Sequence, residues 1–266
     1  MEVNKIYNMK AEEFLPQVES GIIDLTVTSP PYDKLRSYNN DFDLDIIIPE
    51  LKRVTAPGGI CVWIVADQTK NFTESGSSFK QALAFIKYGW CLFDTMIWEK
   101  RNPMPGHRER YTDAFEYMFV FSKGKPKTFN PIKVPCKTAG INQKWEERPH
   151  ESKVWKKNGS QIRKTNEMKI KTNVWKYATG RGGSTNDSIA FEHPAIFPEK
   201  MVADHISSWT NEGDLVADIF SGSGTTQKVA HLMNRKWIGS EHCKINCAIS
   251  EKRLKPYLNN LFTTQN

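Results

Sequence analysis

Short apolar runs alternate with helical patterns at both ends of the chain, and this alternation most restricts the folds available to it. Gly21–Val27 and Ile60–Val65 predict buried strands, and Asp45–Val54 between them predicts a helix. Ala56–Gly59 predicts a turn because it contains a proline and two glycines. Strands separated by helices are typical of an α/β, doubly wound, mostly parallel sheet. Further strands are expected at Cys91–Trp98, Phe115–Phe121, Asp214–Ile219 and Trp237–Glu241, and further helices at Phe79–Tyr88, Pro198–Ser208, Thr226–Met233 and Ile245–Leu254.

The composition is typical of a soluble globular protein. The 266 residues are 39% hydrophobic, and the mean hydropathy is -0.56. No apolar run approaches the ~18 residues of a membrane-spanning helix, and Met1–Lys10 lacks the apolar core of a signal peptide. The five cysteines form no C-x-x-C pair, which argues against a disulfide framework and a structural zinc site. We therefore expect a reduced, cytoplasmic protein without a metal ion.

Positive charge is concentrated in one internal segment. The net charge is +7, and Ser122–Arg181 carries 16 Lys and Arg residues against 4 Asp and Glu residues. The rest of the chain carries 21 against 26, so a mildly acidic body contains one strongly basic segment. A polyanion is the natural partner because neutralised phosphates release counterions, and a solvated basic surface is the alternative. We expect three parts, at residues 1–121, 122–181 and 182–266.

A glycine-rich loop, Asp218–Thr226, lies between a predicted strand and a predicted helix. Its glycines allow the backbone to approach a ligand, and the start of the helix offers free N–H groups. The Gly-Lys-Ser/Thr of a P-loop is missing, and Gln227 stands where a dinucleotide loop has its third glycine. A nucleoside without a pyrophosphate, such as S-adenosylmethionine, fits best, and Glu241 is placed to accept hydrogen bonds from its ribose hydroxyls. A plain tight turn is the alternative.

The Thr-Ser-Pro-Pro-Tyr loop at Thr28–Tyr32 suits a planar amine. Two prolines fix the backbone, so that the Ser29 hydroxyl and the Pro30 carbonyl can accept the two amine N–H groups while Tyr32 stacks on the ring. Such acceptors in a dry pocket favour the positively charged, tetrahedral amine that forms as a methyl group arrives. A rigid turn with an exposed tyrosine is the alternative.

Together these stretches resemble the amino-methylating DNA methyltransferases, which modify cytosine N4 or adenine N6, in their β-type motif order. The resemblance extends from Ile22–Tyr32 to Phe220–Thr226 and leaves only the region around Pro131–Lys171 without a counterpart. It implies the S-adenosylmethionine-dependent methyltransferase fold with an inserted target-recognition segment, and double-stranded DNA as the substrate. The stretches between these two loops that carry it are Glu50–Gly59, Met96–Pro103, Ala114–Tyr117 and His193–Lys200.

The resemblance implies a role for each matching residue. Asn8 stands where many relatives have a Gly-Asp pair that helps hold the adenosine end of the cofactor. The motif that closes over the methionine end contains His193, Phe197 and Pro198. The catalytic loop corresponds to Ser29, Pro30, Pro31 and Tyr32. The cofactor loop and the ribose carboxylate correspond to Asp218, Phe220, Ser221, Gly222, Ser223, Gly224, Thr225 and Glu241.

The first residue of the catalytic loop bears on the choice of base. Ser29 is typical of N4-cytosine enzymes, whereas adenine enzymes usually carry Asp. The resemblance therefore favours N4-cytosine methylation in a restriction-modification, phage or orphan system, with N6-adenine methylation as the alternative. The basic segment and the loop order disfavour methylation of a protein glutamine amide. A catalytically silent DNA-binding module would need neither loop.

A base inside a duplex must be flipped out to reach such a pocket, so DNA contacts are expected around it. Trp145, Trp155 and Trp175 are predicted to be local core rather than base readers. Candidate phosphate contacts near the active face are Arg36, Lys100, Arg101, Arg108 and Arg110. Candidate DNA contacts within the basic segment are Lys156, Lys157, Arg163 and Lys164. A cognate restriction endonuclease and a second copy of the chain are candidate partners, and association with the nucleoid is expected.

Overall fold

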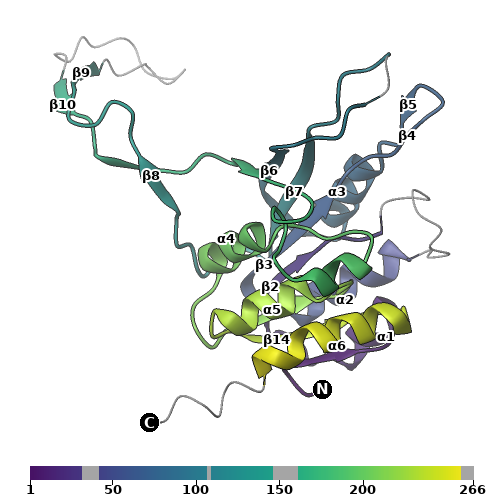
Figure 1. Cartoon of the computed structure of the whole chain (residues 1–266). Coiled ribbons are helices and arrows are strands. Elements are labelled where there is room, and N and C mark those ends of the chain that lie inside the picture. The colour runs from purple at the N-terminus through teal and green to yellow at the C-terminus, as the bar shows by residue number, and fades with distance from the viewer. Residues whose placement is uncertain (32–41, 107–108, 146–160, 259–266) are drawn as a thin grey trace. The chain divides into compact units, whose positions relative to one another are not determined.

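The structure is a computed structural model that describes residues 1–31, 42–106, 109–145 and 161–258 (Figure 1). The chain separates into two compact units. The main unit consists of Met1–Asn130 and Asn173–Asn266, and the smaller unit is Pro131–Thr172. The expected functional division at residues 1–121, 122–181 and 182–266 stays a prediction.

An eight-stranded sheet forms the centre of the main unit. Its strands pair in parallel except at β7, which is antiparallel to both of its neighbours. The prediction of an α/β fold with a mostly parallel sheet is therefore confirmed. The strand order is β1 (Lys5–Tyr7), β14 (Lys236–Ser240), β13 (Leu215–Asp218), β2 (Ile23–Thr28), β3 (Thr55–Val65), β7 (Phe115–Ser122), β6 (Cys91–Lys100) and β12 (Val174–Tyr177).

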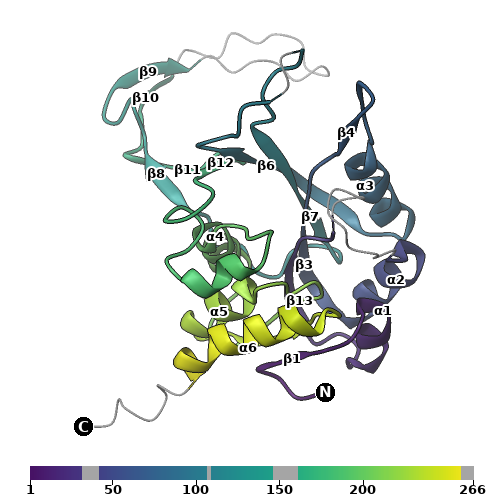
Figure 2. The same ribbon diagram turned by 45° about the vertical axis from the view of Figure 1, so that its right-hand side comes forward.

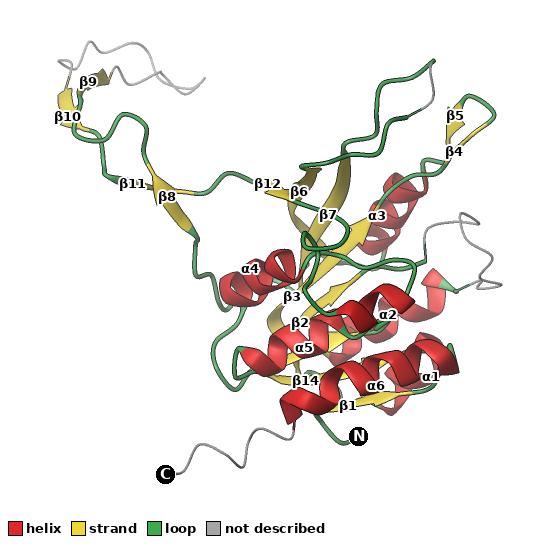
Figure 3. Ribbon diagram, viewed as in Figure 1, coloured by secondary structure: helices red, strands yellow, loops and turns green. Residues whose placement is uncertain are grey.

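Helices cover both faces of this sheet, as a doubly wound fold requires (Figure 3). None of the described helices is long and apolar enough to cross a membrane. One face carries α1 (Ala11–Phe14), the short 3-10 helix η1 (Leu15–Gln17), α2 (Leu44–Val54) and α3 (Ser77–Lys87), and the other carries α4 (Glu199–Trp209), α5 (Thr225–Leu232) and α6 (Lys244–Leu258) (Figure 2). A further 3-10 helix, η3 (Ser188–Glu192), precedes α4, and a small hairpin, β4 (Thr69–Lys70) and β5 (Thr73–Glu74), precedes α3.

The core joins these layers through large apolar side chains. The ring of Phe85 on α3 stacks on Phe121 of β7 with centroids 4.2 Å apart, and it meets Trp63 of β3 edge-on at 5.0 Å. All three side chains are fully or almost fully buried, and burial of such a side chain contributes about 1.5–3 kcal/mol. The strands are therefore fixed firmly enough to hold the loops at their ends.

Ala56–Gly59 is not the turn that its sequence predicts but part of β3. The pairing with β2 jumps here, since Ile23 lies opposite Thr55 and Leu25 lies opposite Ile60. The extra residues of β3 form a bulge in which Gly58 has a positive φ of 72°. The proline and glycines thus mark an irregularity within a strand, because β2 pairs with β3 on both sides of it.

The sequence did not predict the two edge strands of the main sheet, β1 and β12. β12 lies in the basic segment, but its residues Trp175 and Tyr177 are buried and pair with β6. The prediction that Trp175 is core is confirmed. Trp155 lies outside the described residues, as does the side chain of Trp145.

The smaller unit contains two antiparallel ribbons. β8 (Lys133–Pro135) pairs with β11 (Met168–Ile170), and β9 (Asn142–Trp145) pairs with β10 (Gln161–Lys164). The Lys171 amide donates to the Ile132 carbonyl at 2.8 Å, so the chain enters and leaves this unit side by side.

The main unit anchors the chain where the smaller unit begins and ends. The Asn130 amide donates to the Ser208 carbonyl at 2.8 Å, and the Asn173 carbonyl accepts from the Ile97 amide at 2.9 Å.

Candidate active site

The two loops singled out in the sequence follow neighbouring strands. β2 leads into Ser29, β13 leads into the glycine loop, and the two strands pair in parallel. A buried hydrogen bond joins their ends, because the Thr28 hydroxyl donates to Asp218 Oδ1 at 2.6 Å. The candidate catalytic loop and the candidate cofactor loop are therefore tied together, although 190 residues separate Thr28 from Asp218. This is the edge at which doubly wound sheets bind ligands.

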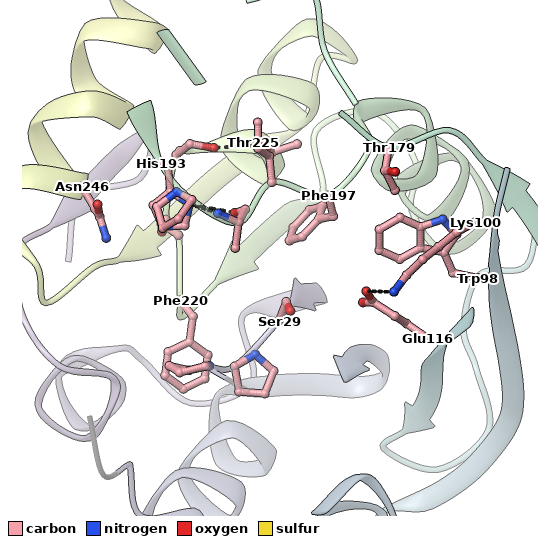
Figure 4. Close-up of a pocket in the computed structure, with 18 of the residues that line it drawn as sticks. Ser29, Trp98, Lys100, Glu116, Thr179, His193, Phe197, Phe220, Thr225 and Asn246 are labelled. Atoms are coloured by element: carbon pink, nitrogen blue, oxygen red, sulfur yellow. Dashed lines mark hydrogen bonds and ion pairs between the residues drawn. The ribbon is translucent and has the colours of Figure 1, made fainter. Parts of the chain in front are cut away.

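A cavity of about 540 Å³ lies between these loops, within the main unit. Its size falls within the range that is usual for small-molecule sites. Figure 4 shows Ser29 near the middle, with His193 and Asn246 toward one end and Trp98, Lys100 and Glu116 toward the other. The residues predicted from sequence that line it are Ser29, Pro30, Pro31, Lys100, His193, Phe197, Phe220, Ser221, Gly222, Ser223, Thr225 and Glu241.

The glycine loop adopts a conformation that suits close ligand approach. Gly222 and Gly224 have positive φ angles of 51° and 75°, which side-chain-bearing residues rarely adopt. A Cβ atom added at Gly222 would lie 3.1 Å from His193 Cε1. Gly222 therefore allows the backbone turn and also leaves space for the His193 ring that packs against it.

Glu241 fixes the loop from the end of β14. Its Oε2 accepts from the Gly222 amide at 2.9 Å, and its Oε1 accepts from the Cys243 amide at 2.9 Å. The carboxylate also lines a second, smaller cavity beside Phe42 and Phe220. Each carboxylate oxygen can accept a further hydrogen bond, so a ribose diol at this end fits the residues that are present.

Asn8 lies beside the same turn but lines neither cavity. Its side-chain amide donates to the Glu241 carbonyl at 2.8 Å and to the His242 carbonyl at 3.0 Å. Asn8 thus holds the backbone that carries the carboxylate. The larger cavity is also not lined by Pro198, Gly224 or Asp218.

Asp218 is a buried carboxylate at the end of β13. Burial raises the pKa of Asp218 to about 6, although hydrogen bonds from the Thr28 hydroxyl and the Phe220 amide oppose the shift. The group is thus close to changing its protonation state near neutral pH. Its hydrogen-bond partners show that it organises the ends of β2 and β13.

The other end of the cavity carries Lys100, which the sequence predicted as a phosphate contact, beside Glu116, Trp98 and Thr179, which sequence analysis did not select. The Lys100 ammonium lies 3.0 Å from Glu116 Oε1, and their side chains are only 20% and 10% exposed. Trp98 and Thr179 lie beside this pair (Figure 4). Glu116 had a signal in the sequence, because it is a charged residue within the otherwise apolar and aromatic strand Phe115–Phe121.

A second group that sequence analysis missed lies behind the glycine loop. Arg253 of α6 is buried and donates to the Ser223 carbonyl at 3.0 Å and to Thr225 Oγ1 at 2.9 Å. The same guanidinium pairs with Asp187 and Glu199, and both carboxylates also pair with the buried Lys228. These ion pairs lower the pKa of Asp187 and raise that of Lys228, against the opposing effect of burial on each.

The candidate DNA contacts fall into three groups. Arg101, Arg110 and Lys164 are exposed, and Arg110 also pairs with Glu74 at 2.6 Å, which connects the β6–β7 loop to the β4–β5 hairpin. Lys100 lies in the cavity. Four further candidates lie outside the described residues, together with the side chain of Arg163: Arg36, Arg108, Lys156 and Lys157. Tyr32 of the candidate catalytic loop also lies outside them. Across the described part of the chain, no group of three or more His, Cys, Asp and Glu residues is arranged to hold a metal ion.

Comparison with known proteins adds to this geometry. The orphan methyltransferase M.BamHII of Bacillus amyloliquefaciens is 50% identical over 242 residues, which are 89% of this chain and 90% of that protein. The solved structure of the PvuII DNA methyltransferase (cytosine-N4-specific) has a TM-score of 0.67 at 21% identity, covering 98% of this chain and 93% of that chain. The M1.HpyAVI-SAM complex has a TM-score of 0.61 at 24% identity, covering 94% and 99%.

The two solved structures support the fold that the sheet order describes. A sequence profile of the N6/N4 methyltransferases, described as DNA methylase, matches residues 23–252 and so includes both loops of the cavity. On this match and the 50% identity, the chain belongs to the N6/N4 family of DNA methylases.

Proposed function

We propose that this DNA methyltransferase transfers a methyl group to the exocyclic N4 amine of a cytosine flipped out of double-stranded DNA. The observation that carries the proposal is the position of Ser29. This serine, rather than an aspartate, lines the cavity between the glycine loop and the Lys100–Glu116 pair. The cofactor and the target base would thus meet at Ser29.

The cofactor is S-adenosylmethionine, which supplies an electrophilic methyl group when it is bound. Glu241 would hold its ribose, and the backbone of the glycine loop would approach it closely. Phe220 offers an aromatic face where the two cavities adjoin. His193 packs over Gly222 and would cover the loop from above.

Ser29 and Pro30 would then act on the amine of the target base. An exocyclic amine is a poor nucleophile because its lone pair is delocalised into the ring. Hydrogen bonds to the Ser29 hydroxyl and the Pro30 carbonyl favour the tetrahedral amine, because each acceptor binds more strongly as positive charge develops on nitrogen. Tyr32, which lies outside the described residues, is predicted to stack on the ring.

The product decides between the two bases. We would incubate the protein with labelled S-adenosylmethionine and mixed-sequence duplex DNA, digest the DNA and identify methylated nucleosides by mass spectrometry. N4-methylcytosine is expected. N6-methyladenine would keep the family and the cofactor but overturn the cytosine proposal. A cognate endonuclease and a homodimer stay predictions, and sedimentation of the purified protein would test the second.

Replacement of Ser29 tests its role directly. Ser29→Ala should lower kcat by about 10²–10³, since one acceptor for the transition state is removed, while the affinity for S-adenosylmethionine stays close to that of the wild type. Ser207→Ala, on α4 and away from the cavity lining, is the control and should retain activity. Wild-type turnover by Ser29→Ala would show that the hydroxyl takes no part in the reaction.

A further inference from the structure

The Lys100–Glu116 pair lies at the end of the cavity that the cofactor loop does not form. Lys100 belongs to β6 and Glu116 to the adjacent strand β7. The ends of these strands are joined by the hydrogen bond from the Lys100 amide to the Ala114 carbonyl at 2.8 Å. The two side chains are mostly buried, yet both line the cavity near Ser29 (Figure 4). Removing charged groups from water is costly unless their remaining hydrogen-bonding capacity is used. This arrangement therefore calls for a polar ligand.

We infer that Lys100, oriented by Glu116, donates a hydrogen bond to the O2 carbonyl of the flipped cytosine and so selects cytosine over adenine. This inference rests on the proposed function, because it assumes that the N4 amine lies at Ser29. Lys100 thereby becomes a specificity-determining residue that holds the far side of the base, and Glu116 becomes its positioning residue.

The chemistry of the two bases explains the selection. Along the edge that begins at its exocyclic amine, cytosine presents two acceptors, N3 and O2. Adenine presents one acceptor, N1, followed by a C–H group. A lysine ammonium carries three N–H donors, and the ion pair with Glu116 uses one of them. Cytosine can satisfy a second donor through O2, whereas adenine would leave that donor without a partner on the base.

A second lysine–glutamate pair in the same sheet joins two adjacent strands but lies outside the cavity. Lys176 of β12 pairs with Glu99 of β6, and their side chains are 53% and 41% exposed. Neither residue lines the cavity. This exposed pair joins strands in the same sheet, so it provides a matched control for the removal of a lysine from an ion pair.

The test compares duplexes that carry cytosine or 2-thiocytosine at the target position. Sulfur is a much weaker acceptor than oxygen, so the wild type should lose about tenfold to a hundredfold in kcat/KM on the thio substrate. Lys100→Met should lose a similar factor on cytosine but show little further loss on 2-thiocytosine. Glu116→Gln should be affected in the same direction and less strongly. Lys176→Met should behave as the wild type does, and every variant should keep its affinity for S-adenosylmethionine.

The results separate this inference from the proposed function. If the wild type makes N4-methylcytosine but handles both substrates equally well, Lys100 does not contact O2, and this result needs no variant. If Lys100→Met is slowed on cytosine and still shows the full thio effect, the lysine has only a structural role. If the wild type makes N6-methyladenine alone, the proposed function itself is wrong.

Discussion

At the scale of single residues, Gly222 combines two requirements that can be tested separately. Its φ is positive, and a Cβ atom there would press on His193. Gly213 has the same kind of backbone, with a φ of 83°, but a Cβ atom there would meet nothing within 4 Å. Gly222→Ala and Gly213→Ala should each lower the free energy of unfolding by about 1 kcal/mol.

Only Gly222→Ala should also weaken the binding of S-adenosylmethionine, because it displaces His193 and disturbs the amide that donates to Glu241. Calorimetric titration of both variants with the cofactor measures this. Equal affinities in the two variants would mean that the contact between the glycine loop and the histidine has no part in binding.

Asp218 should make the stability of the protein without cofactor depend on pH. Burial raises its pKa from 3.8 to about 6, so the folded protein holds this proton more tightly than the unfolded chain. The contribution of Asp218 to stability is complete below about pH 4 and is lost as the pH rises through about 6. Asparagine stays neutral, so the free energy of unfolding of Asp218→Asn should rise relative to that of the wild type as the pH increases from 4 to 7, by up to about 3 kcal/mol. Thermal unfolding across this range measures the difference, and parallel curves for the two proteins would contradict it.

At the scale of elements, α6 supports the candidate cofactor loop, although no residue of that loop belongs to α6. Arg253 on α6 bonds Ser223 and Thr225 at the start of α5, and through Glu199 it also reaches the first turn of α4. With Lys228 and Asp187 this forms a group of two buried cations and two partly buried carboxylates. The charges balance, so the group holds three helices and the loop together without a net buried charge.

Arg253→Met should leave two partly buried carboxylates with only Lys228, and it should lower the free energy of unfolding by about 3 kcal/mol. Arg253→Lys restores the charge without the fork of donors. It should recover much of this stability but raise the KM for S-adenosylmethionine, with less effect on kcat. Lys252→Met, at the exposed neighbouring position, is the control for both measurements. An unchanged KM in a folded Arg253→Lys protein would mean that the arginine stabilises the fold without positioning the loop.

At the scale of the whole molecule, the charge distribution predicts how DNA binding responds to salt. Neutralising Lys156, Lys157, Arg163 and Lys164 together should weaken binding and flatten the dependence of log K on log salt by about 0.9 for each phosphate that the protein no longer neutralises. A variant neutralised at four exposed lysines of the main unit (Lys80, Lys87, Lys252 and Lys255) is the matched control. An equal slope in both variants would place the DNA surface outside the basic segment.

At this scale, the sequence predicted most of the main sheet and part of the candidate site. Alternating strands and helices predicted most of the main sheet, because its central strands are continuous apolar runs. β1 has only three residues, and β12 lies among charged residues, so neither has such a run. Ser29 and Gly222 belong to local patterns and were predicted as site residues, whereas Glu116 and Arg253 gain their positions from contacts with distant parts of the chain. Such contacts follow from tertiary packing, so the charge of Glu116 within an apolar strand was its only local signal, and Arg253 had none.

The β8–β11 ribbon has a consequence for how such a protein can diversify. The chain leaves the main unit at Asn130, returns at Asn173, and is hydrogen-bonded to it at both points. Ile132 and Lys171 are themselves hydrogen-bonded, so whatever lies beyond them is attached through two adjacent strands. Recombination between these two points can exchange the intervening residues, whatever their number, while the cavity that contains Ser29 and Glu241 stays intact. On the prediction that the basic segment recognises the target, such an exchange would change the DNA sequence that is methylated and leave the candidate active site as it is.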